Sequence, residues 1–221
     1  KVQEQVQRSV YWWNKVATYA QRKPSPLNGF DLFNYMALIV CARARDYAEI
    51  TFHKFADELE AKDAAGQYAF GAPENEKHRV TWEGIAVWTY LGATFKGLKN
   101  QGAVMTGSAY PGLWSLVYTP GDLESMAEAY TNVYINTCGP NRYEEFYKVV
   151  KNSKSDGIVL HLNRSCKLMG LLNNEGAEYV NAKMGVPYVS FDGDQTDPRV
   201  FTPAQYETRV QALTEMMDEN Q

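Results

Sequence analysis

The stretch DGIVLHLNRSCKLM, residues 156–169, decides the fold class. Its apolar run has the length of a buried strand, and polar residues typical of a loop follow it immediately. Helix-length stretches separate this run from three similar ones, and such alternation predicts right-handed βαβ units and a parallel sheet. The four expected strands are Arg79–Trp82, Ala103–Thr106, Gly157–Leu162 and Pro187–Phe191.

Helices are expected between and after these strands. The last one has a clear start signal, because Thr202 can cap it, Pro203 suits its first turn and Gln205 stands where a capping box needs its acceptor. The predicted class is therefore α/β, a small doubly wound four-stranded parallel sheet with flanking helices. The expected helices run from about Ile85 to Asn100, Asp122 to Asn136, Arg142 to Asn152, Cys166 to Met184 and Pro203 to Met217.

The chain before the sheet is expected to form a helical N-terminal section. Apolar residues between Val2 and Arg22 recur every three or four positions, which is typical of an amphipathic helix. Two further helices are expected at about Asp31–Arg45 and Tyr47–Ala61. The predicted organisation is a helical section at 1–63, a linker or long loop at 64–78 and a parallel-sheet domain at 79–221.

Composition excludes several classes of protein. The chain has 221 residues, a net charge of -4 and a pI near 5.5, which gives no electrostatic reason to bind nucleic acid or an anionic membrane. No apolar run approaches the ~18 residues that span a bilayer, and the opening KVQEQVQRSV lacks the apolar centre of a secretory signal. We therefore expect a cytoplasmic protein, and Lys1 in place of Met suggests a piece of a longer one.

Ligands of open parallel sheets bind outside the carboxyl ends of the strands. This rule makes Glu83, Ser108, Asn163 and Arg164 candidates for lining a substrate pocket, although residues in such positions also serve only to shape loops. The glycine pattern of dinucleotide-binding folds follows none of the expected strands, so a dinucleotide cofactor is not supported.

Cys166 is the most reactive-looking residue. It is expected at a helix N-terminus between Arg164 and Lys167, where the helix dipole and two cations favour the thiolate that a metal or a nucleophilic mechanism needs. The alternative is a buried cysteine flanked by surface charges. Cys41 and Cys138 are interpreted as structural, as small hydrophobic residues.

Two other groups resemble metal sites only weakly. The segment DGDQTDPR, residues 192–199, lacks the glycine and the closing glutamate of a calcium loop, and we interpret it as an acidic turn. The histidines, His53, His78 and His161, show no metal-ligand spacing.

Four blocks of sequence resemble consecutive parts of the 2-hydroxyacyl-CoA dehydratase family, and within it the α subunits. The likeness runs in order from about Pro24 to Glu219, and NRSCK followed about thirty residues later by DGDQTDPR is its most specific part. The blocks are RVTWEGIAVW (79–88), MTGSAYPGLWSL (105–116), DGIVLHLNRSCKLM (156–169) and YVSFDGDQTDPRVFTPAQYETRVQAL (188–213).

The resemblance implies an enzyme of anaerobic metabolism, such as amino-acid fermentation, that removes water from an (R)-2-hydroxyacyl-CoA to give a 2-enoyl-CoA. It implies a radical route through a ketyl, a related second subunit, and a separate ATP-dependent iron–sulfur activator protein that supplies an electron. It leaves open which acyl group is used and whether the complex also holds a flavin.

The resemblance also implies a [4Fe-4S] cluster held by three cysteines, of which the one in the RSCK motif is Cys166 here. The other two belong to an N-terminal domain that precedes the matched region. The chain alone is therefore expected to hold no complete cluster and to be inactive. The alternatives are a benzoyl-CoA reductase type of subunit, or a domain without a cluster that serves only in assembly.

Overall fold

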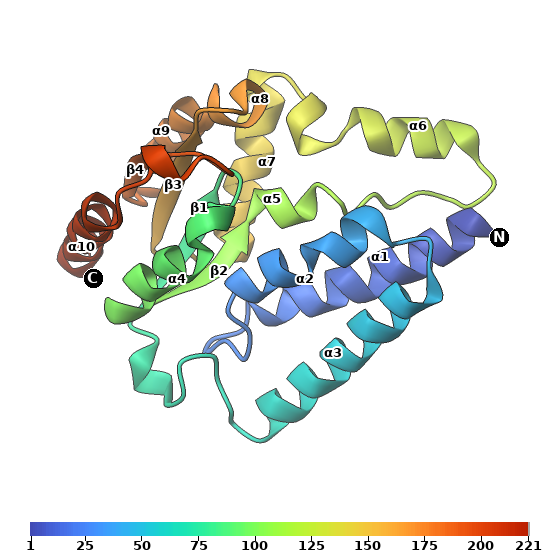
Figure 1. The fold of residues 1–221 in the computed structure, drawn as a ribbon, viewed down its shortest axis with the longest axis horizontal. Coiled ribbons are helices and arrows are strands. Elements are labelled where there is room, and N and C mark those ends of the chain that lie inside the picture. The colour runs from blue at the N-terminus through green and yellow to red at the C-terminus, as the bar shows by residue number, and fades with distance from the viewer. Residues whose placement is uncertain (221) are drawn as a thin grey trace.

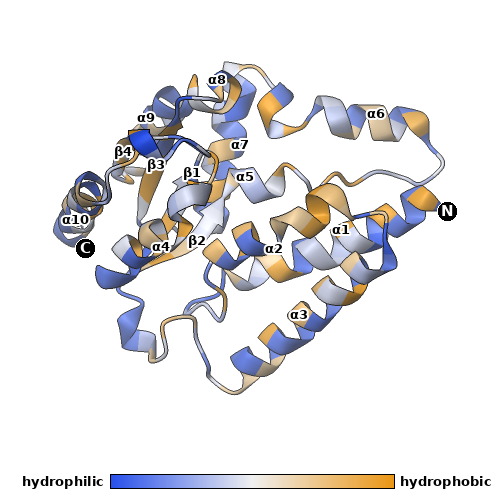
Figure 2. Cartoon of the chain, in the orientation of Figure 1, coloured by the Kyte–Doolittle hydropathy of each residue, from blue (hydrophilic) through white to orange (hydrophobic). Residues whose placement is uncertain are grey.

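The computed structural model describes residues 1–220, and its first part is a group of three helices. α1 and α3 pack side by side, with α2 between them and the sheet (Figure 1). Figure 2 shows hydrophilic and hydrophobic residues alternating along α1 and α3, as expected for helices with one buried face. The helices are α1 (Val2–Tyr19), α2 (Phe30–Cys41) and α3 (Asp46–Ala64).

The second part contains a four-stranded sheet in which every pairing is parallel. The strand order is β2-β1-β3-β4, so the chain moves outward in one direction after β1 and in the other after β3. This order confirms the predicted parallel sheet. The strands are β1 (His78–Glu83), β2 (Ala103–Ser108), β3 (Gly157–Asn163) and β4 (Tyr188–Gly193).

Helices cover both faces of this sheet, as a doubly wound fold requires. On one face, Val210 and Leu213 of α10 pack with Val80, Trp82 and Val159. On the other, side chains of α7 and α9 pack against Ile158 and Leu160 of β3. The covering helices are α4 (Leu91–Asn100) and α10 (Pro203–Glu219) on the first face, and α7 (Gly139–Asn152) and α9 (Asn173–Met184) on the second.

Short helices and 3-10 turns fill the connections. The segment 64–78, expected as a linker, contains the 3-10 turn η1 and an isolated bridge between Tyr68 and Gly71. The remaining elements are α5 (Ala109–Gly112), α6 (Leu123–Thr131), α8 (Lys167–Gly170), η1 (Pro73–Asn75), η2 (Trp88–Tyr90), η3 (Tyr134–Asn136) and η4 (Pro198–Val200).

Several expected helices differ in extent from the observed ones, and the one expected over 31–45 ends at Cys41. The helix expected from Ile85 begins at Leu91, because Ile85–Val87 are buried in a segment without regular secondary structure. The helix expected over 122–136 ends at Thr131, and the one expected over 166–184 is interrupted between α8 and α9. Thr202 precedes α10 as expected, but its side chain makes no capping hydrogen bond.

Aromatic packing joins the helical section to the sheet. Phe30 and Phe33 of α2 belong to the same buried cluster as Trp82 of β1, with ring centroids 5.5 and 6.3 Å from that of Trp82. The three helices also have a core of their own, in which Trp13 packs against Phe52.

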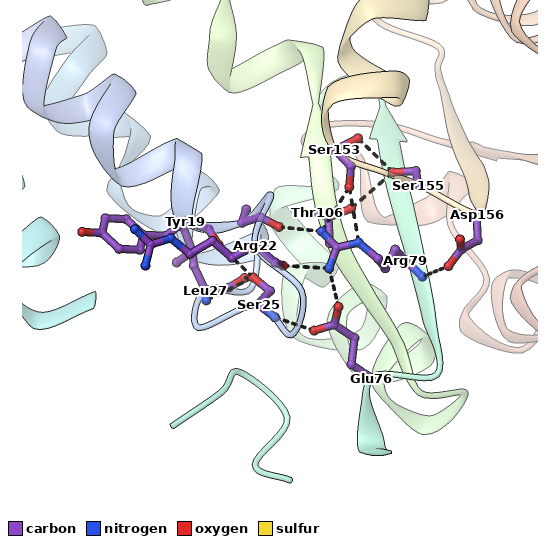
Figure 3. Close-up of polar contacts among 11 residues, drawn as sticks. Tyr19, Arg22, Ser25, Leu27, Glu76, Arg79, Thr106, Ser153, Ser155 and Asp156 are labelled. Carbon is purple, nitrogen blue, oxygen red and sulfur yellow. Dashed lines mark hydrogen bonds and ion pairs between the residues drawn. The ribbon is translucent and has the colours of Figure 1, made fainter. Parts of the chain in front are cut away.

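A buried arginine ties the two parts together at the amino ends of the strands (Figure 3). Arg79 of β1 is 1% exposed, and its guanidinium donates to the carbonyls of Ala20 and Arg22 after α1 and of Ser153 after α7. Its charge is balanced by an ion pair with Glu76. Hydrogen bonds to a charged group are worth more than neutral ones, so we assign Arg79 a structural role.

Within residues 1–220, no helix has both the length and the apolar character needed to cross a membrane.

Candidate functional site

The strand order identifies where a ligand should bind. Because the chain leaves β1 and β3 in opposite directions, the carboxyl ends of these two paired strands form a topological switch point, which is the usual binding crevice of such sheets. Glu83 is the last residue of β1, and the loop containing Cys166 follows β3 directly. Two of the candidates therefore flank the switch point.

Cys166 is a free, half-buried thiol at the start of α8. It packs beside an apolar cluster of Ile85, Leu113 and Met169. α8 has only four residues, so the aligned peptide dipoles of the long helix expected from the sequence do not stand behind the thiol. The neighbouring Arg164 and Lys167 side chains are exposed. The loop geometry, rather than a helix dipole, therefore sets the surroundings of this cysteine.

Glu83 is completely buried beneath this region. The hydroxyl of Tyr134 donates to its Oε1 over 2.8 Å, while Oε2 has no hydrogen-bond partner within residues 1–220. Burial raises the pKa of Glu83 to about 7, although the hydrogen bond from Tyr134 and the charge of Arg142 both act to lower it. Glu83 is thus a carboxyl group that can hold or release a proton near neutral pH.

Asn163 joins the loops that follow β3 and β4. Its Oδ1 accepts from the backbone N–H of Gln195 at 3.2 Å and of Ser165 at 3.4 Å. The hydroxyl of Ser165 in turn donates to Asp194. That bond, with backbone N–H groups of Thr196 and Asp197, holds the pKa of Asp194 well below its usual range. The polar atoms of Asn163 and Asp194 are therefore engaged in shaping the loop that carries Cys166.

The side chains of the other two candidates are engaged elsewhere. Arg164 is exposed and pairs with Asp192 at 3.4 Å, where both side chains are about 60% exposed. Ser108 caps α5 by accepting from the N–H of Tyr110, and it lines a surface cavity of about 380 Å³ that Tyr134 also lines. Tyr134, which bonds to Glu83, thus lines the same cavity as Ser108, whereas the Arg164 side chain is engaged with the end of β4.

The remaining cysteines are exposed rather than packed in the core. Cys41 is the last residue of α2, and Cys138 precedes α7. Their exposure does not fit the expectation that they pack as small hydrophobic residues. In the part of the chain that the structure describes, no three His, Cys, Asp or Glu side chains are grouped so that they could hold a metal ion. The acidic turn has a local role, since Asp197 caps η4 through the N–H of Arg199.

Sequence reasoning missed two residues of the site, Tyr134 and Arg142. Arg142 is 2% exposed, and its guanidinium carbon lies 4.6 Å from the centre of the Tyr134 ring. Both stand in the polar-looking segment YINTCGPNRYEEF, residues 134–146, where nothing distinguishes a buried arginine from a solvated one. The signal that could have pointed to Arg142 is Glu83, because a carboxyl group at the end of a buried strand is often balanced by a buried cation.

Comparisons with known proteins identify the family of the chain. The chain matches the profile of the family described as 2-hydroxyglutaryl-CoA dehydratase, D-component, over residues 1–217. It is 61% identical over 222 residues to lactoyl-CoA dehydratase subunit alpha of Anaerotignum propionicum, a match covering 100% of this chain and 52% of that protein.

More distant relatives include the type of subunit that the sequence resemblance favoured. Identity is 40% over 213 residues with (R)-2-hydroxyglutaryl-CoA dehydratase subunit alpha of Acidaminococcus fermentans, covering 96% of this chain and 44% of that protein. It falls to 23% over 211 residues with a subunit of benzoyl-CoA reductase from Thauera aromatica, covering 90% and 49%. The chain spans about half the length of the curated relatives it matches.

Proposed function

Because the chain belongs to the family of 2-hydroxyglutaryl-CoA dehydratase D-components, we propose that it forms part of a subunit that removes water from an (R)-2-hydroxyacyl-CoA. The observation that carries the proposal is the position of Cys166, a half-buried thiol in the loop after β3, beside the topological switch point. In this proposal Cys166 supplies one thiolate ligand to a [4Fe-4S] cluster.

The described residues do not build a complete cluster site, since no three potential ligands are grouped among them. The remaining ligands must come from elsewhere in the assembled enzyme. When bound, such a cluster supplies one-electron chemistry. The ketyl route belongs to the same proposal, because transient reduction of the thioester lets the 2-hydroxyl group leave although the β-hydrogen is barely acidic.

The residues of this chain have a more limited part in the proposal. Cys166 binds the cluster, and Asn163 and the Ser165–Asp194 hydrogen bond shape the loop that carries it. Glu83 holds a proton at the carboxyl end of β1. We further propose a related second subunit, an ATP-dependent activator protein and a cytoplasmic location. The relative at 61% identity has the name of a lactoyl-CoA enzyme, so lactoyl-CoA is the first substrate to assay.

The proposal is tested in an enzyme assembled to the full length of the relatives, with its second subunit. Cys166→Ala should lose bound iron and acid-labile sulfide together with dehydration of lactoyl-CoA, because the two remaining thiolates cannot retain a cluster that needs three. Unchanged iron in this variant would remove Cys166 from the ligand set. Cys41→Ala and Cys138→Ala are matched controls that should retain iron. A loss of iron in Cys138→Ala would show that Cys138 is a ligand.

The same purified enzyme and its variants distinguish the dehydratase from two alternative functions. A benzoyl-CoA reductase type of subunit would reduce benzoyl-CoA and leave the 2-hydroxyacyl-CoA unchanged. If the domain serves only in assembly, the Cys166→Ala enzyme should keep its iron and its dehydration activity. Deletion of the whole domain should then release the second subunit.

A further inference from the structure

The one-turn helix α8 ends against a buried arginine. A helix of four residues cannot satisfy its last carbonyl groups internally. Nη1 of Arg142 donates to the carbonyl of Leu168 at 2.7 Å, and Nη2 donates to that of Met169 at 3.0 Å. Nη2 also lies 3.4 Å from Oδ1 of Asn173, the first residue of α9. A single guanidinium therefore holds both sides of the break between α8 and α9.

The guanidinium is itself supported from β1. It stacks on the ring of Tyr134, whose hydroxyl bonds to Glu83 at the end of that strand. A continuous series of contacts thus runs from Glu83 through Tyr134 and Arg142 to α8. It connects the carboxyl end of β1 with the loop after β3, which are the two sides of the topological switch point.

This network is incompletely satisfied. Nε of Arg142, Nδ2 of Asn173 and Oε2 of Glu83 are buried and lack partners in the described part of the chain. Unpaired buried polar atoms cost free energy of folding, and apolar side chains of similar size would fill the space without that cost. Such groups are typical of sites whose polar geometry serves a function.

We propose that Arg142 is a positioning residue for Cys166. By holding the carbonyls of Leu168 and Met169 it fixes α8 against the sheet, and this sets the direction in which Sγ of Cys166 leaves the loop. The inference rests on the proposed function in one respect, that Cys166 is the residue whose position matters. Lys cannot replace Arg in this role, because an ammonium group lacks the planar fork that reaches two carbonyls.

The test measures how fast each cysteine of the chain reacts with iodoacetamide, followed by mass spectrometry of the peptides. Cys41 is exposed at the end of α2 and provides the internal reference. Arg142→Lys should raise the rate of Cys166 relative to Cys41 by roughly tenfold, the change expected when hydrogen bonds to a charged group no longer hold a local segment closed. An unchanged ratio would overturn the proposal.

Arg79→Lys is the matched control. Arg79 is the other buried arginine that binds several carbonyls, but it does so at the amino ends of the strands. Its replacement should lower the stability of the chain while leaving the Cys166 to Cys41 ratio within about twofold of the original, because distant sites act independently. An equal rise in both variants would mean that Arg142 acts only through global stability.

A milder variant decides the question if Arg142→Lys does not fold. Tyr134→Phe keeps the ring under the guanidinium and removes only the hydrogen bond to Glu83. It should raise hydrogen exchange of the amides of Gly170 and Leu171, which bond to the carbonyls of Cys166 and Lys167, without raising exchange in α10. No local rise would contradict the proposal.

These measurements need no iron, so their outcome is distinct from that of the proposed function. If Cys166→Ala retains iron but Arg142→Lys loosens Cys166, the ligand assignment fails and the positioning role stands. If Cys166→Ala loses iron but Arg142→Lys leaves the thiol unchanged, the positioning role alone fails.

Discussion

The hydroxyl of Tyr134 donates a hydrogen bond of 2.8 Å to Oε1 of Glu83, a carboxyl group with no exposed surface. Burial raises the pKa of Glu83 from 4.5 to about 7. The same burial raises the pKa of the Tyr134 hydroxyl well above its usual range, so this group keeps its proton and remains the donor. Glu83 therefore changes charge near neutral pH without losing its partner.

Glu83 should make the chain less stable as pH rises. The folded state keeps the proton up to about pH 7, whereas the unfolded state releases it near pH 4.5. The stabilisation by protonated Glu83 is therefore complete below pH 4.5 and is lost as pH rises to about 7. At about 1.4 kcal/mol per pH unit the loss reaches about 3 kcal/mol. Urea unfolding of Glu83→Gln and the original chain should diverge by this amount between pH 4 and 8.

The comparison with Glu83→Gln is needed because a second group acts in the opposite direction. Burial lowers the pKa of His161, which adds stability as pH rises through the ordinary titration range of histidine. Gln keeps the acceptor for Tyr134 and removes only the titration. Parallel pH profiles of the two proteins would show that Glu83 is ionised in the folded state throughout.

Gly84→Ala should destabilise the switch-point turn strongly. Gly84 has φ of +102°, and a Cβ there would lie 2.5 Å from the carbonyl oxygen of His161. Strained backbone together with a clash against main chain should cost roughly 3 kcal/mol or more in urea unfolding.

Gly121→Ala separates the two causes. Gly121 has φ of +90°, but a Cβ there meets nothing within 4 Å. Its replacement should cost only about 1 kcal/mol, the backbone part of the effect. Equal losses at the two glycines would mean that β3 moves to relieve the contact with His161.

The chain by itself should bind little iron. Cys166 is the single cysteine of the loop after β3, and no three potential ligands are grouped within residues 1–220. Anaerobic reconstitution followed by iron and sulfide analysis should therefore give much less than one cluster per chain. About four irons per chain would show that Cys41 and Cys138 join Cys166.

Local pattern was sufficient to predict the strands and most of the helices. Each expected strand lies within one residue or two of an observed one, because short apolar runs between helix-length stretches have few other solutions. The pattern was not sufficient for Ile85–Val87, which look helical but are buried in a segment without regular secondary structure. There Nδ1 of His161 bonds the carbonyl of Ile85, a contact between distant segments that propensity does not register.

The sequence by itself determined the parallel sheet, the place of Glu83 and Cys166 at the ends of their strands, and the family. The tertiary structure alone decided that Glu83 is buried, that α8 stops after one turn and that Arg142 holds it. The physical reason lies in the range of the interactions. Periodicity records which face of an element is apolar, whereas burial of a charge depends on partners from other elements, here α7 and the segment before it.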